Sequence, residues 1–116
     1  VFDYNDFHRH TRVVGEAPLE PGRHEIGLRI ERTPDGGADV SLTVDGHVAG
    51  TGRLPRLLFI VSTQGMDIGR SLSPVNGEYE APFAYTGKIV RVVFELPRTL
   101  PPGEVKARAR AEMSRQ

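Results

Sequence analysis

The fold prediction rests on the stretch Thr86–Leu96, with the sequence TGKIVRVVFEL. After Gly87 its apolar and charged residues alternate, which is the two-residue period of a strand with one buried face. Ile89 and Val93 break the alternation and indicate a bulge or a partly covered outer face. We therefore expect a core strand that a long loop, residues 66–85, delivers into a sheet. Its inward residues are Val90, Val92, Phe94 and Leu96.

Two earlier stretches show the same alternation and are joined by turn signals. His24–Arg32 is the clearest strand, with Ile and Leu on one face and charged residues on the other. Asp39–Asp45 repeats the pattern, and the sequence TPDGG at Thr33–Gly37 is a typical turn. Asp45-Gly46 is then a strong hairpin signal, because a type I′ turn needs positive φ at both central residues.

The register after this second turn has two solutions. A strict two-residue turn would place Ala49 and Thr51 inward and Val48 outward, and a longer turn would reverse them. Gly50 and Gly52 add the signal of a bulge, a bend or a close approach of another backbone.

Three further segments read as extended chain. Phe2–Phe7 and His10–Val14 are short strands that a turn separates. Leu57–Val61, with the sequence LLFIV, is a continuous apolar run too short for an ordinary helix. It is predicted to be a central strand covered on both faces.

These strand signals, with Gly and Pro turns between them, predict an all-β antiparallel sandwich. We assign residues 1–100 to the sandwich and residues 101–116 to a short helical tail. An isolated helix of that length is marginal in water, so the tail is expected to fray or to dock through few residues. The predicted core residues are Leu28, Leu42, Phe59, Val92 and Phe94.

Composition restricts the class of protein. Lys plus Arg total 15 and Asp plus Glu total 15, a balance that argues against a nucleic-acid partner and against an electrostatic membrane anchor. Cysteine is absent, which excludes disulfides, thiolate zinc sites and a cysteine nucleophile. No apolar run approaches the ~20 residues that span a bilayer. The chain begins within strand-like sequence, so we expect it to be a fragment of a longer polypeptide.

Several short motifs occur in the order found at the C-terminus of one enzyme family. They are FDYN at Phe2–Asn5, PL and PGRH within Pro18–His24, VDG from Val44, MDIGR at Met66–Arg70, and PFAYTGKI at Pro82–Ile89. In this order they resemble the C-terminal region of large bacterial arylsulfatases over nearly the whole chain. The family often has a second acidic residue shortly after the glycine of the Asp-x-Gly loop, where this chain has Arg70-Ser71.

The resemblance implies a jelly-roll sandwich, similar to concanavalin A-like and laminin G-like domains. It implies a non-catalytic accessory domain that packs against the sulfatase catalytic domain and shapes substrate access. The parent enzyme would hydrolyse sulfate esters, with formylglycine and Ca²⁺ in its catalytic domain and neither on this chain. The Cys/Ser-x-Pro/Ala-x-Arg signature that matures into formylglycine is absent from the sequence. The origin would be bacterial, with a cytoplasmic and a periplasmic location both open.

The candidate interface or ligand residues are Asp67, Arg70, Tyr79 and Tyr85. Tyrosine joins an apolar ring to a polar tip and therefore suits an interface. Asp67, with carbonyl groups of its loop, could hold Ca²⁺, but calcium takes ~6–8 oxygen ligands and this loop offers few carboxylates. We expect Asp67 to cap the turn that Gly69 completes.

A free carbohydrate-binding module is the alternative function, and it would need an exposed row of aromatic rings. Phe2, Tyr4, Phe83 and Tyr85 could supply such a row. Aromatic residues at alternate strand positions are more often core, and Pro82 before Phe83 favours the core interpretation there.

The histidines offer a weaker metal hypothesis. His8 and His10 would share one face of a strand and could ligate a metal, but no third ligand has diagnostic spacing. Two surface histidines are the simpler interpretation. His24 and His47 lie beside turns and are predicted to be solvent-exposed.

Overall fold

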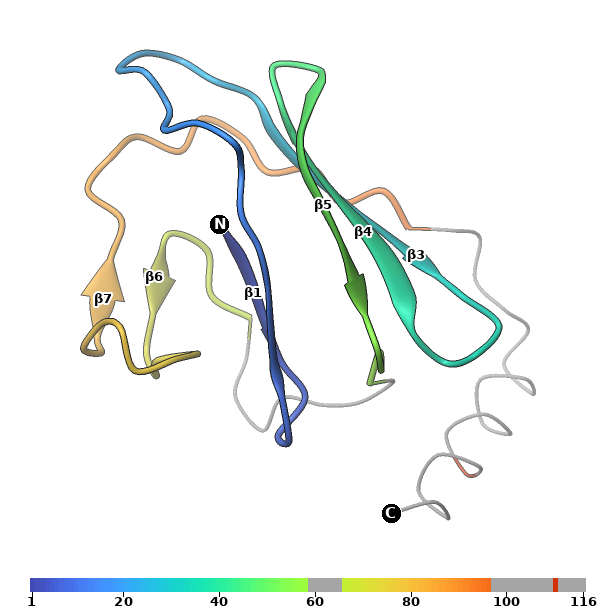
Figure 1. Ribbon diagram of the computed structural model, residues 1–116. Helices are drawn as coiled ribbons and strands as arrows, with labels where there is room; N and C mark the ends of the chain where they lie inside the picture. Colours follow the sequence, from blue (N-terminus) through green and yellow to red (C-terminus); the bar gives the residue numbers. More distant parts are fainter. Residues whose placement is uncertain (59–65, 97–109, 111–116) are drawn as a thin grey trace. The chain divides into compact units, whose positions relative to one another are not determined.

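The computed structural model describes residues 1–58, 66–96 and 110 (Figure 1). The chain forms two compact units. The first comprises Val1–Leu58 with Pro74–Tyr79, and the second comprises the described parts of Phe59–Ser73 and Glu80–Gln116. Among the described residues the regular structure is almost entirely strand, and every strand pair is antiparallel, which confirms the all-β prediction.

The first unit is built on a three-stranded meander of β3 (Ile26–Arg32), β4 (Ala38–Val44) and β5 (His47–Leu54). The predicted turn at residues 33–37 joins β3 to β4, and Thr33 N donates to the Gly37 carbonyl at 3.0 Å. The predicted type I′ turn joins β4 to β5, with φ of 51° at Asp45 and 81° at Gly46. Both hairpin predictions are confirmed.

A bulge in β5 resolves the register that the sequence left open. The pairing shifts between Leu42 and Thr43, so that Leu42 lies opposite Gly50 and Thr43 opposite Val48. The turn has two residues and Val48 points outward, but the bulge then places Gly50 inward in place of Ala49.

A second hairpin, β1 (Phe2–Asn5) and β2 (His10–Val13), packs on the inner face of β4 and β5. The contact is close at Gly52, where a Cβ would lie 2.5 Å from Cγ2 of Val13, so glycine lets the two layers meet. Phe2, Tyr4 and Leu57 pack around this contact. The buried apolar core consists of Val13, Ala38, Val40, Leu42 and Leu54.

Only part of the predicted core is correct. Leu42 is buried at 8% exposure, whereas Leu28 is 46% exposed, Val92 is 45% exposed and Phe94 is 56% exposed. Phe59 lies outside the described residues. The face was assigned correctly for Leu28, which is paired with Leu42, but β3 is an edge strand and the β1–β2 hairpin packs on β4 and β5.

The predicted last strand is also wrong, because residues 87–96 have no regular structure. Alternation makes a segment suitable for a sheet, but a strand exists only where a partner takes its backbone hydrogen bonds. In the described part of the second unit, strand pairing occurs between β6 (Arg70–Ser71) and β7 (Phe83–Ala84). Leu57 and Leu58 lie outside any strand. Residues 59–61 and the tail lie outside the described residues, except Arg110, which is helical.

Candidate functional site

Asp67 and Arg70 form an ion pair across the tight loop that leads into β6. Arg70 Nε donates to Asp67 Oδ1 at 3.1 Å, and Gly69 between them has φ of 77°, a conformation that glycine adopts without strain. Tyr85 N donates to the Gly69 carbonyl at 2.8 Å and extends the β6–β7 pairing by one bond. The structure thus brings together three of the four candidate residues.

This pairing bears on the calcium hypothesis. The Asp67 carboxylate is bound by a guanidinium at the place where the resembling family often has a second acid, so a calcium ion would have to displace a cation. The side chain bonds to Arg70 rather than to a backbone amide of the described loop, so the predicted turn cap is replaced by an ion pair. Among residues 1–58, 66–96 and 110, no group of three or more His, Asp or Glu side chains could hold a metal ion.

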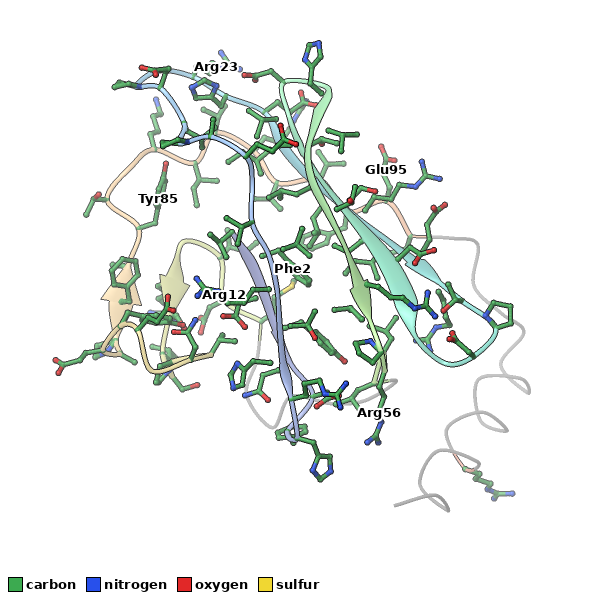
Figure 2. All side chains as sticks on the ribbon, viewed as in Figure 1. Phe2, Arg12, Arg23, Arg56, Tyr85 and Glu95 are labelled. Atoms are coloured by element: carbon green, nitrogen blue, oxygen red, sulfur yellow. The ribbon has the colours of Figure 1, made fainter. Side chains whose placement is uncertain are left out.

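Phe83 and Tyr85 are both exposed, so the core interpretation of Phe83 is wrong, whereas the exposure of Tyr85 fits its candidacy as an interface or ligand residue. They stand two residues apart, Phe83 in β7 and Tyr85 directly after it. The Tyr85 ring (Figure 2) lies against Gly87, where a Cβ would overlap the ring atoms. One side of this ring is therefore supported by backbone.

Tyr79 belongs to the first unit and is half-buried. Its hydroxyl accepts a hydrogen bond from Val75 N at 3.0 Å and closes the 74–79 loop on itself. Tyr79 thus has a structural role within its own unit, separate from the Asp67–Arg70 pair.

The 74–79 loop is fixed to the β1–β2 hairpin by polar contacts. Asn76 Nδ2 donates to Asp3 Oδ2 at 2.6 Å, and Arg12 Nη1 donates to Glu78 Oε1 at 2.5 Å (Arg12 is labelled in Figure 2). Arg12 Nε also lies 3.7 Å from Asp3 Oδ2. These groups form a network of polar contacts between the loop and the hairpin.

The N-terminal histidines lie on the surface, as predicted. His8 is exposed in the β1–β2 turn, where its backbone N donates to Asp6 Oδ1 at 3.0 Å. His10 begins β2, and its Nδ1 lies 3.5 Å from Asp3 Oδ1. Because His8 lies in the turn and His10 in the strand, the two do not share a strand face.

His24 is the main residue that the sequence interpretation missed. Its Nδ1 lies 2.7 Å from Asp45 Oδ2 and its Nε2 lies 2.7 Å from the Glu20 carbonyl oxygen. The predicted solvent-exposed ring is therefore held on both sides, with 23% of the side chain exposed. The signal was available in the hairpin register. Counting outward from the 33–37 turn places Glu25 opposite Asp45, one residue from His24.

Comparisons with protein-family models, with curated proteins and with solved structures found no match to this chain. In the described part of the chain, no helix is both long enough and apolar enough to cross a membrane.

The surface feature best suited to a partner is an aliphatic row on β3, which consists of Ile26, Leu28 and Ile30. Their exposed fractions are 59%, 46% and 40%. They pair with Val44, Leu42 and Val40 respectively, so the row continues the face that is buried on β4. The opposite face of β3 is charged. Arg29 and Glu31 are exposed there, with Arg29 Nη2 2.6 Å from Glu31 Oε1.

Proposed function

We propose that this chain is a non-catalytic accessory β-domain of jelly-roll type at the C-terminus of an arylsulfatase, and that it packs against the catalytic domain. The main observation in support of this proposal is the aliphatic row of β3. Three large aliphatic side chains lie in register with the core face yet stay exposed. Contiguous apolar surface of this kind marks protein–protein contact.

The chemistry of the row suits a protein partner better than a sugar. Full burial of an Ile or Leu side chain is worth about 1.5–3 kcal/mol, so covering three half-exposed ones would contribute on the order of 3 kcal/mol. Sugar-binding faces use aromatic rings that stack on the sugar, and the row contains none. The opposite face of β3 carries charged side chains, which suit contact with water.

The motif order supports the sulfatase assignment. The Asp67–Gly69 loop, the PFAYTG segment and the VDG turn keep the family's order, and the VDG turn has the two positive φ values that its sequence requires. Arg70 is the departure, and its ion pair with Asp67 fits a structural role for this loop.

The test is hydrolysis of a chromogenic aryl sulfate. The isolated chain should give no turnover, and the natural polypeptide that contains it should turn the substrate over. Formylglycine should be found by mass spectrometry in the longer protein and outside this chain. Turnover by the isolated chain that a Ser or His substitution abolishes would refute the accessory assignment, as would a longer protein without sulfatase activity.

A free carbohydrate-binding module is the second candidate, and the exposure of Phe83 and Tyr85 favours it. Two rings two residues apart, one backed by Gly87, form a small stacking platform. Titration with soluble polysaccharides, followed by the NMR signals of these rings, tests it. Binding that Y85A abolishes and Y79F leaves intact would favour the module.

A further inference from the structure

His24 lies between two hydrogen-bond acceptors. Its Nδ1 faces a carboxylate oxygen of Asp45 and its Nε2 faces the carbonyl oxygen of Glu20, each at 2.7 Å. A neutral imidazole carries one N–H and can serve only one of them. Only the imidazolium, with two N–H groups, can donate to both acceptors at once.

The two acceptors belong to different segments. Asp45 opens the β4–β5 turn and is fixed there, because Glu25 N donates to its Oδ1 at 2.8 Å and its own N donates to the Glu25 carbonyl at 2.8 Å. Glu20 lies in the exposed 16–23 loop. The loop starts from Glu16, whose N donates to the Ala49 carbonyl at 2.9 Å. His24 therefore fastens the far end of the loop.

The surrounding charges favour the protonated ring. The Asp45 hydrogen bond, followed by the Glu20 carbonyl, raises the pKa of His24 above its ordinary value, and partial burial opposes them. The Glu20 side chain acts in the same direction through its charge. His47 faces the same turn, with its Nδ1 3.1 Å from the Asp45 carbonyl oxygen, and acts on the Asp45 carboxylate rather than on the ring.

We propose that protonated His24 is a pH-sensitive clamp that holds the 16–23 loop to the β4–β5 turn and releases the loop when the imidazolium loses its proton. The remaining N–H stays with the Asp45 carboxylate, because a hydrogen bond to a charged acceptor is the stronger of the two. The Glu20 carbonyl then loses its donor. Residues 17–23 are all described, and the bond to the Glu20 carbonyl is the hydrogen bond that the structure shows for them.

The direction of the pH effect on the clamp follows from the raised pKa of His24. Because the pKa of folded His24 is raised above 6.5, the clamp is complete below that pH and is lost as the pH rises through the elevated pKa. Asp45 has a lowered pKa, caused first by the Glu25 amide and then by His24, so its carboxylate stays charged until the pH falls below 3.8. This inference is independent of the sulfatase proposal.

The test is NMR on the 116-residue chain at about pH 5.5 and about pH 8.5, with heteronuclear NOEs for Leu19, Glu20 and Gly22. The loop should be rigid at the lower pH and mobile at the higher pH, with the same midpoint as the His24 ring signals. H24Q should remove the pH dependence. H47Q is the matched control and should keep it, because His47 lacks the second acceptor.

The D45N variant should still fold, because Asn also tolerates positive φ at this turn position, so it can be used to test the proposal. It should move the midpoint of the His24 ring titration to lower pH, since the charge that favours the imidazolium is gone. Loop mobility that changes with pH equally in H24Q overturns the proposal. So does a loop that stays rigid while the His24 ring titrates, or a D45N midpoint that does not move.

Discussion

Leu28 and Leu42 are direct partners across β3 and β4, yet Leu42 is 8% exposed and Leu28 is 46% exposed. Both side chains point to the same face of the sheet. The difference arises because the β1–β2 hairpin covers β4 and β5 and stops before the edge strand β3. The first unit therefore has a closed half and an open half of one apolar face.

This relationship predicts unequal costs for two identical substitutions. L42A should lower the free energy of unfolding by about 2–5 kcal/mol, the range for a buried leucine. L28A in the isolated chain should cost less than about 1.5 kcal/mol, because roughly half of its side chain already contacts water. Urea unfolding of both variants measures the difference. Equal losses would mean that β3 is covered in the isolated chain.

The contact of Gly52 with Val13 makes a second prediction. A Cβ at residue 52 would lie 2.5 Å from Val13 Cγ2, so G52A should destabilise the chain by about 1–3 kcal/mol through overpacking. The G52A/V13A double variant should be less destabilised than the sum of the single variants. G77A is the control, because no atom lies within 4 Å of a Cβ at that position. Additive effects would contradict the close approach of the two layers.

The hydrogen bonds of Asp35 in the β3–β4 turn predict that the chain loses stability at acid pH. Thr33 donates to the Asp35 carboxylate, and Arg53 and Gly37 N donate to it as well, which lowers its pKa to about 2. A lowered folded pKa means that this stabilisation is present above 3.8 and is lost as the pH falls through about 2.

D35N should therefore flatten the fall in melting temperature between about pH 4 and pH 2. D39N is the matched control, since it also removes a partner of Arg53 but leaves the hydrogen bonds inside the turn. An unchanged acid profile in D35N would show that Asp35 does not carry the effect.

Local chemistry explains which parts of the fold the sequence predicts. The Asp45-Gly46 turn and the TPDGG turn demand particular backbone angles, and they set the β3–β4–β5 meander without distant information. The Thr86–Leu96 alternation failed because a strand also needs a partner edge, which periodicity does not specify. The β5 bulge at Ala49 was signalled by Gly50 and Gly52 but not located, since glycines fit either side of a bulge.

The candidate site, like the fold, was predicted from the sequence only in part. The sequence identified Asp67 and Arg70 separately, and their ion pair follows from spacing across a tight glycine turn. It overlooked the clamp of His24, although the hairpin register brings Asp45 within one residue of it. Tyr79 is a candidate because of its amphipathic ring, and the structure shows that its hydroxyl closes a loop of the first unit.

The central claim is that a catalytic domain covers the aliphatic row of β3. Carbene footprinting with mass spectrometry measures it directly, because the reagent labels exposed aliphatic side chains. Leu28 and Ile30 should be labelled in the isolated chain and protected in the natural polypeptide. Val48, which is exposed on the opposite face, should be labelled in both. Equal labelling of Leu28 in the two proteins would contradict the account.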